Sequence, residues 1–404
     1  MSNRPAAPTG LRFYSHGSAC GYGLAGVDFV RALVKAGLPV EWVHLVQPGW
    51  EARRLQPGEQ PPMLAMAGDD ASLRDLPELL AATSRPLRAD TVLVHYTPEN
   101  WKVGFESGCR NIGFTCWEAD RLPPHWMPIV QQAHSILVPC RANQLAMRHS
   151  GVRRPVHVVP HVLRTTWNEF EPAEVEQFRA GLGIPPNHTV FYSIGTWDPR
   201  KDLSALMRAY ARAFTADDAV TLVVKTEANG YGPQPYFRSE PTAALAQKTI
   251  DALQAELGRE LPAIVLLPYE ISGRGIDLLH AIGDCYVSLS HGEAWGMGAF
   301  DAAARGTPVI MTGWGGQTDF LGEKWRGNIA YRMALTPVYP PERPSFWPPQ
   351  RWAVADESAA VEMMREVQRS PGPWRRDAAA LRAEIARRYD ETVVIPQLLA
   401  ALAA

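Results

Sequence analysis

The chain has 404 residues, of which 46% are hydrophobic and 20% charged, and its formal net charge is −2. This length exceeds one ordinary hydrophobic core and fits two domains of roughly 150 to 200 residues each, with a cleft expected between them. The balanced charge argues against a general nucleic-acid binder, because a protein that follows phosphates needs a surplus of Lys and Arg.

The chain also lacks the marks of a membrane or exported protein. No window approaches the ~20 uninterrupted apolar residues of a membrane span, and the first ten residues, MSNRPAAPTG, lack the apolar region of a signal peptide. We therefore expect a cytoplasmic protein without a transmembrane segment, and peripheral contact with a membrane stays open. The five cysteines include no CxxC pair, so neither a disulfide framework nor a zinc site is predicted.

Short apolar runs alternate with helical patterns, which predicts α/β domains with repeated βα units on parallel sheets. In the first half the predicted strands are Leu11–Ser15, Val40–Leu45, Thr91–His95, Asn111–Thr115, Ser135–Pro139 and Val156–Val159. In the second half they are Thr189–Ile194, Thr221–Lys225, Ile264–Leu267, Cys285–Leu289 and Pro308–Met311. We expect an N-terminal domain over 1–165, a linker over 166–188, a C-terminal domain over 189–375 with a proline-dense loop at 337–349, and a helical segment over 376–404.

A glycine-rich loop follows the first predicted strand, and its Gly21-x-Gly23-x-x-Gly26 spacing matches the dinucleotide fingerprint. The match raises an NAD-dependent oxidoreductase as one alternative. The placement argues against it, because the residues from His16 to Cys20 separate the strand end from Gly21. In addition, Glu41 stands at the start of the second strand, whereas a ribose-binding acid belongs at its end.

The segment Ser288–Phe320, SLSHGEAWGMGAFDAAARGTPVIMTGWGGQTDF, carries the main functional prediction. Its pattern indicates a buried strand, a glycine-rich turn, a helix that begins near Met297, and a second strand. Carboxylates at Glu293 and Asp301 can hold hydroxyls by charge-assisted hydrogen bonds, one on a sugar and one on a ribose. The residues between them, Gly296–Gly298, present backbone amides at a helix N-terminus, which suits a diphosphate. The alternative is two solvated acids beside an ordinary helix start.

This segment resembles the glutamate-x7-glutamate motif of retaining GT-B glycosyltransferases, in particular glycosyltransferase family four, whose typical string is EGFGLPLLEAMACGTPVI. Here the motif stands as EAWGMGAFD from Glu293 to Asp301, followed by ARGTPVI. Asp301 replaces the second Glu, and Ala294 replaces a Gly. The resemblance implies a GT-B architecture: two Rossmann-like doubly wound domains face each other across a cleft, and a C-terminal helical segment over 376–404 crosses back and packs on the N-terminal domain.

A second string, VFYSIGTWDPRKDLSALMRAYARAF over 190–214, is similar to the family's other anchor, a strand, a glycine, a basic position and a Lys that opens a helix. Lys201 matches that Lys, which neutralises the leaving diphosphate. Thr196 stands where the family usually has Arg, and Arg200 is the candidate substitute. The alternative for both cations is solvated charge in the first turn of a helix.

The resemblance implies further donor contacts. It places the nucleotide base on backbone groups at Tyr269–Ser272, which include Tyr269 and Ile271, and it gives Gly21 and Gly23 a role in closing over the donor phosphates and the acceptor. Many retaining members carry a catalytic His in the cleft near the fourth or fifth strand, and His95 is the nearest equivalent. The alternative for His95 is a hydrogen-bonded structural histidine.

The acceptor prediction rests on Gly113–Val162, which resembles a family-four subgroup with strings such as FETDRLPPEW. Glu118 and Asp120 follow a strand's carboxyl end, where ligands bind in open α/β sheets, and are predicted to orient an acceptor hydroxyl. Trp117 is predicted to stack on a sugar face, together with two other tryptophans, Trp101 and Trp126. The alternative is a loop packed by tryptophan, with the acids at a helix N-cap.

These observations predict a retaining hexosyltransferase of the EC 2.4 class that acts in polysaccharide or glycoconjugate biosynthesis. The donor would be a nucleotide diphosphate sugar, a UDP- or GDP-sugar, and the acceptor a hydroxyl on a glycan, a lipid-linked molecule or a small molecule. Because the sequence holds no Asp-x-Asp motif, we expect metal independence and no cofactor. The alternatives are a related GT-B phosphorylase or epimerase, a non-catalytic sugar-nucleotide-binding protein and, less favoured, the oxidoreductase.

Overall fold

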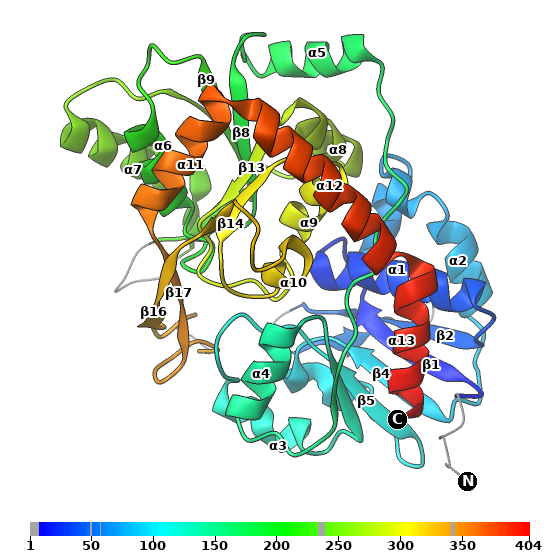
Figure 1. Ribbon diagram of the computed structural model, residues 1–404. Coiled ribbons are helices and arrows are strands. Elements are labelled where there is room, and N and C mark those ends of the chain that lie inside the picture. Colours follow the sequence, from blue (N-terminus) through cyan, green and yellow to red (C-terminus); the bar gives the residue numbers. More distant parts are fainter. Residues whose placement is uncertain (1–7, 49–50, 57, 233–238, 341–343) are drawn as a thin grey trace. The chain divides into compact units, whose positions relative to one another are not determined.

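The computed structural model describes residues 8–48, 51–56, 58–232, 239–340 and 344–404. The chain divides into two units, the first made of Met1–Trp167 with Ile385–Ala404 and the second of Asn168–Glu384. Each unit is an α/β structure around a largely parallel sheet (Figure 1). Helix α12 (Pro371–Tyr389) belongs to both units, because the division falls within it.

The sheet of the first unit has the order β3-β2-β1-β4-β5-β6-β7, and its pairs are parallel except for β2 with β3. The order reverses at β1, which has β2 on one side and β4 on the other. In open α/β sheets, ligands bind outside the carboxyl ends of the strands at such a reversal. The strands are β1 (Leu11–His16), β2 (Val40–Val46), β3 (Arg53–Arg54), β4 (Thr91–His95), β5 (Arg110–Phe114), β6 (Ser135–Val138) and β7 (Val156–Val158).

Helices connect these strands and bury the core of the first unit. The C-terminal helix α13 contacts α1, and its residues Val394 and Leu398 join the same apolar core. The helices are α1 (Gly21–Lys35), α2 (Leu76–Thr83), α3 (Met127–Val130), α4 (Arg141–His149) and α13 (Glu391–Ala403).

The sheet of the second unit has the order β12-β9-β8-β13-β14-β15 with parallel pairs throughout, so the order reverses between β8 and β13. Two antiparallel ribbons, β10 with β11 and β16 with β17, lie outside this sheet. The strands are β8 (Thr189–Ile194), β9 (Val220–Thr226), β10 (Asn229–Tyr231), β11 (Ser239–Pro241), β12 (Ala263–Pro268), β13 (Cys285–Ser288), β14 (Val309–Thr312), β15 (Asn328–Ile329), β16 (Tyr331–Leu335) and β17 (Arg351–Ala355).

Helices cover both faces of this sheet, as a doubly wound fold requires. Helices α6, α7 and α11 lie on one face, and α8 and α9 lie on the other (Figure 1). The helices are α5 (Pro172–Gly181), α6 (Leu203–Ala213), α7 (Thr242–Leu257), α8 (Gly273–Ile282), α9 (Met297–Ala304), α10 (Gln317–Leu321) and α11 (Glu357–Arg369).

Every strand predicted from the sequence is present, with ends that differ by at most one residue. Three details differ from the predictions. The linker 166–188 includes helix α5, and the helical pattern near the C-terminus divides into α12 and α13 because Asp390 caps the amide of Thr392. The short ribbons and β3 escaped prediction, since strands of two or three residues carry no periodic signal.

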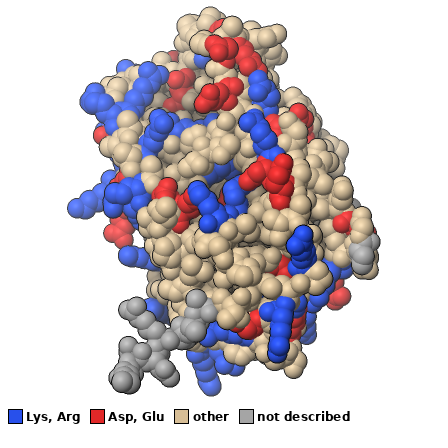
Figure 2. Space-filling model, turned by 90° about the vertical axis from the view of Figure 1, so that its right-hand side faces the viewer, with Lys and Arg blue, Asp and Glu red and all other residues tan. Residues whose placement is uncertain are grey.

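The surface charge, the hydropathy of the helices and the state of the cysteines can be compared with the predictions from composition. Basic and acidic side chains are intermingled over the middle of the face drawn in Figure 2, so that part of this face is not a single basic stripe. Among the described residues, the helices include none that is long and apolar enough to cross a bilayer. The five cysteines are free thiols.

Candidate functional site

The turn that follows β8 is organised by Asp198. One carboxylate oxygen of Asp198 accepts the amide of Lys201 at 2.9 Å, and the other accepts the hydroxyl of Thr196 at 2.7 Å. Asp202 then adopts a left-handed backbone conformation (φ 42°) and caps the amide of Ala205, so α6 begins only at Leu203. The prediction that Lys201 opens the helix is therefore wrong: Lys201 lies in the turn before it.

Lys201 and Arg200 both meet a buried carboxylate from a distant part of the sequence. Glu293 is 7% exposed, and its two oxygens lie 2.5 Å from Lys201 Nζ and 3.4 Å from Arg200 Nη1. Arg200 also donates to the carbonyl of Gly292 at 2.7 Å. Burial alone would raise the pKa of Glu293, but the charges of Lys201 and Arg200 outweigh it and lower that pKa below its usual range. The alternative in which these three side chains are solvated is excluded by this ion-pair cluster.

Backbone contacts hold the two halves of the cluster together. The amide of His291 donates to the carbonyl of Arg200 at 2.7 Å, and the amide of Gly316 donates to the carbonyl of Glu293 at 2.7 Å. A Cβ at Gly316 would lie 1.8 Å from the carbonyl oxygen of Ala294. The loop after β14 can therefore cover the Glu293 turn only because it carries glycine there.

The predicted helix start after Glu293 is present. Gly296 takes a left-handed conformation (φ 86°) as the N-cap of α9, and no side chain caps that end of the helix. A Cβ at Gly298 would lie 2.9 Å from the hydroxyl of Tyr286, so the first turn of α9 approaches β13 closely. Asp301 lies in the next turn of α9 and is partly exposed. The amides of Met297 and Gly298 thus follow Glu293, the carboxylate of the ion-pair cluster, within five positions of the chain.

The residues predicted to hold the nucleotide base follow β12. Tyr269, which is 50% exposed, and Ile271 lie between the end of that strand and α8, where the Ser272 hydroxyl accepts the amide of Gly275. All the donor residues predicted in the second half therefore lie beyond the carboxyl ends of β8, β12 and β13.

In the first unit, His95 lies at the carboxyl end of β4 and is fully buried. Its ring centroid is 4.6 Å from that of Phe114 and 5.2 Å from that of Tyr22, and neither ring nitrogen has a hydrogen-bond partner in the structure. Burial, with a smaller effect of His161, lowers the pKa of His95 well below its usual value. A hydrogen-bonded structural histidine, the alternative considered for this position, is therefore not what the structure contains.

The glycines of the first loop have different surroundings. Gly21 begins α1 and has open space around it, whereas a Cβ at Gly23 would lie 1.8 Å from the carbonyl oxygen of Ser18. The loop that precedes α1 therefore folds back over the first turn of that helix. Gly23 permits this close approach.

The prediction that tryptophans stack on acceptor sugars is wrong for the structure as it stands. Trp101, Trp117 and Trp126 are 0%, 4% and 1% exposed, and the rings of Trp117 and Trp126 pack edge to face at 4.7 Å. A ring buried in this way offers no face to a sugar. Glu118 and Asp120 are partly exposed beyond the end of β5, and no helix begins at either residue, so the N-cap alternative also fails.

Three residues around the Lys201–Glu293 ion pair were not singled out from the sequence. Asp198 and Asp202 shape the turn that carries Lys201, and His291 connects that turn to Glu293 through its amide. The dipeptide Asp198-Pro199 is a turn signal that could have indicated Asp198. The part played by His291 depends on a pairing of distant segments, which has no local signature.

Comparison with known proteins places these observations among glycosyltransferases. Residues 142–395 match the family described as Family 4 Glycosyltransferase in conflict systems. A D-inositol 3-phosphate glycosyltransferase of Segniliparus rotundus is 27% identical over 231 residues, which are 57% of this chain and 45% of that relative. The matched region thus spans less than half of the curated relative.

Solved structures are similar over nearly the whole chain. Anabaena HepE, crystallised with UDP and glucose, has a TM-score of 0.60 at 16% identity over 96% of this chain and 98% of that one. Sucrose-phosphate synthase from Thermosynechococcus elongatus has a TM-score of 0.60 at 16% identity, over 96% and 97% of the two chains. At this identity the likeness concerns the fold, and it agrees with the GT-B architecture predicted from the sequence.

Proposed function

The chain belongs to the family 4 glycosyltransferases of conflict systems, and on that basis we propose that it moves a hexosyl group from a nucleotide diphosphate sugar to a hydroxyl acceptor, with retention at the anomeric carbon. The observation that carries the proposal is the buried Glu293 with its partners Lys201 and Arg200. This cluster lies where the strand order of the second unit reverses, and it directly precedes the uncapped N-terminus of α9 in the chain.

The chemistry follows from the charges. When the sugar leaves, negative charge develops on the diphosphate, and preorganised cations and amide dipoles lower the barrier most when they point at that charge. Lys201, Arg200 and the amides at Gly296–Gly298 would serve this purpose. Glu293 would hold hydroxyls of the donor sugar, and Asp301 would hold the ribose. Because protein groups supply the positive charge, we propose that the reaction needs no metal ion or cofactor.

The similar proteins support a choice of donor and acceptor to test. HepE was solved with UDP and glucose, which supports a UDP-sugar as the donor to test first. The name of the Segniliparus relative supports a polyol hydroxyl as acceptor, and Glu118 and Asp120 are the side chains of the first unit proposed to orient it. A role in polysaccharide or glycoconjugate synthesis is consistent with this donor and this acceptor.

A second candidate is a sugar-nucleotide-binding protein without turnover. The observation that favours it is the loss of the family's usual residues at Thr196, whose hydroxyl bonds to Asp198, and at Asp301. This candidate predicts that nucleotide sugars bind and stay intact.

One experiment separates the two. UDP-, GDP- and ADP-glucose are screened for thermal stabilisation of the protein and for slow hydrolysis, with Lys201→Ala as the test variant and Lys324→Ala, an exposed lysine of the same unit, as its control. The transferase proposal expects hydrolysis of one donor, a loss of about 100-fold or more in Lys201→Ala, and no change in Lys324→Ala. Undiminished turnover in Lys201→Ala would contradict the assigned mechanism.

A further inference from the structure

Asp202 has an unusual backbone conformation. Among the described residues it is the one non-glycine residue with a positive φ, at 42°. Such a conformation costs free energy for a residue with a side chain, and strained residues of this kind gather at functional sites. Asn tolerates the left-handed region as well as Asp does and caps a helix equally well. The property that only Asp supplies at this position is therefore its negative charge.

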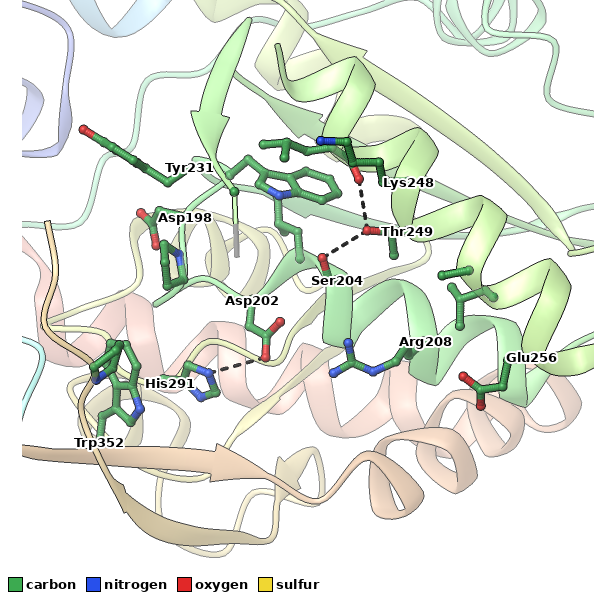
Figure 3. A pocket seen from close by; sticks show the side chains of 18 residues that line it. Asp198, Asp202, Ser204, Arg208, Tyr231, Lys248, Thr249, Glu256, His291 and Trp352 are labelled. Carbon is green, nitrogen blue, oxygen red and sulfur yellow. Dashed lines mark hydrogen bonds and ion pairs between the residues drawn. The ribbon is translucent and has the colours of Figure 1, made fainter. Parts of the chain in front are cut away.

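The carboxylate of Asp202 faces two partners. Its Oδ1 accepts the amide of Ala205 at 3.0 Å, and its Oδ2 lies 3.4 Å from Nε2 of His291 (Figure 3). The other ring nitrogen, Nδ1, donates to the carbonyl of Ala353 at 2.7 Å, because a carbonyl only accepts. Both ring nitrogens of His291 thus face acceptor oxygens. Although burial would raise the pKa of Asp202, its contacts with His291 lower it.

His291 is itself fixed to the β16–β17 ribbon. Its ring stacks on that of Trp352, with 4.7 Å between the centroids and 23° between the planes, and the two side chains lie together in Figure 3. Ala353 accepts from the ring and donates its own amide to the carbonyl of His291 at 2.9 Å. These contacts hold the imidazole against β17, so it can serve as a rigid partner for Asp202.

The contact between Asp202 and His291 closes a ring of bonds that contains both cations. The amide of His291 donates to the carbonyl of Arg200 at 2.7 Å, and its side chain reaches Asp202. The backbone that joins Arg200 to Asp202 passes through Lys201. The turn is therefore tied to one residue at both ends, and loss of either tie would let Lys201 shift relative to Glu293.

A purely structural role for Asp202 is the alternative. An acid at the N-cap of α6 also interacts favourably with the helix dipole. That role predicts a loss of stability without any effect on turnover. It does not require the contact with His291, which lies outside α6.

We propose that Asp202 and His291 act as a positioning couple, which fixes the direction in which Arg200 and Lys201 present their charges to the donor diphosphate. The couple sets the rate of turnover more than the affinity for the donor. This role rests on the proposed function, since it concerns the same two cations.

The test compares the full chain with matched variants. Asp202→Asn keeps the helix cap and the left-handed conformation and removes the charge. His291→Asn keeps the backbone amide and places a side-chain N–H near the position of Nδ1, but it does not reach Asp202. Asp356→Asn is the control, because Asp356 caps α11 of the same unit through the amide of Ser358.

Kinetics separate positioning from capping. With the donor that the parent hydrolyses fastest, kcat should fall at least about 10-fold in Asp202→Asn and in His291→Asn, while KM changes less than about 2-fold. The reason is that a misplaced cation loses its contact with charge that develops only in the transition state. The double variant should be no slower than the slower single variant, because each change removes the same contact. Asp356→Asn should keep the kcat of the parent.

A second measurement does not depend on turnover. In Asp202→Asn the amide of His291, which donates to Arg200, should exchange its hydrogen at least about 5-fold faster than in the parent, because the turn is tied at one end only. The midpoint of thermal unfolding should stay within about 3 °C of the parent, since the cap remains.

Unchanged kcat in either single variant, a change in KM alone, or losses that add in the double variant would overturn the positioning role. A lower unfolding midpoint with unchanged kcat would identify Asp202 as a helix cap alone. If the parent hydrolyses no donor, the proposed function fails. In that case faster exchange of the His291 amide in Asp202→Asn still supports the couple as the tie that holds the turn, and unchanged exchange overturns it.

Discussion

The contact between Lys201 and Glu293 allows a quantitative test of the site. Replacing Lys201 by Met keeps most of the side-chain length and removes the charge that lies 2.5 Å from a carboxylate that is only 7% exposed. With an effective dielectric constant of ~20, two charges at this separation attract by roughly 7 kcal/mol before the cost of desolvation is subtracted. Removing one partner of a buried pair typically costs ~3–5 kcal/mol. Since Arg200 remains 3.4 Å from the carboxylate, we expect a loss of about 2 kcal/mol in unfolding free energy.

The pH dependence of unfolding tests independently whether the Lys201–Glu293 pair stabilises the folded protein. The pKa of Glu293 is lowered in the folded protein, so the stabilisation is complete above the unfolded value of 4.5 and is lost as pH falls through the lower, folded value. In Lys201→Met that pKa rises, so the variant has less of this stabilisation to lose. The difference in unfolding free energy between the two proteins should therefore shrink as the pH is lowered from 7 towards 3.

The assay must resolve the two units, because a two-unit chain need not unfold in one step. Urea unfolding followed by hydrogen exchange at β8 and β13 amides reports the second unit. Lys201→Met with Glu293→Gln is the matched control: it removes both charges of this pair, and because it also takes the carboxylate away from Arg200, it should recover part of the stability while turnover stays low. Equal stability of Lys201→Met and the parent at pH 7, or a difference that does not change with pH, would refute the reasoning.

Three further predictions concern other parts of the molecule. Gly298→Ala puts a Cβ 2.9 Å from the Tyr286 hydroxyl, so we expect the α9 amides to shift and the affinity for UDP, measured by calorimetry, to fall about 10-fold. Adding Tyr286→Phe removes that hydroxyl and should restore the affinity. Burial lowers the pKa of His44 and His161 to about 4, so each should remove roughly 1.5 kcal/mol of first-unit stability between pH 6.5 and 5, measured by urea unfolding, and the lowered pKa of His95 acts in the same direction. Imidazole titration near pH 6.5 by NMR would contradict this. Donor turnover should be the same in EDTA as in added Mg²⁺, and its abolition by the chelator would rule out a purely protein-based charge balance.

The elements were predictable because buried parallel strands are short apolar runs with polar or proline ends. Thr91–His95 and Thr189–Ile194 follow that rule and were predicted with their observed ends. The two arginines of β3 form a strand only by pairing with β2, so no apolar run marks it. Local patterning therefore identifies the strands that build the core and misses those that exist through pairing alone.

The sequence predicted where the site residues lie along the strands, but it did not predict which side chains they contact. Sequence patterning placed Lys201 and Glu293 beyond strand ends, and the Rossmann-like order then brings β8 beside β13 although 92 positions separate the two side chains. The surroundings of His95 depend on α1 packing over β4, and those of Trp117 on its contact with Trp126. Nothing within either local sequence specifies these contacts, which is why the prediction failed for Trp117.

The structure also gives a physical reason why Arg can be absent at position 196. The Thr196 hydroxyl bonds to Asp198, which in turn holds the amide of Lys201, so this position now shapes the turn instead of supplying a charge. Arg200 brings its guanidinium to the same carboxylate that Lys201 contacts. Two cations thus meet one carboxylate, while the acids Asp198 and Asp202 belong to the same turn. Under the proposed function, we expect Arg200 to direct at the diphosphate the positive charge that an Arg at position 196 would otherwise supply.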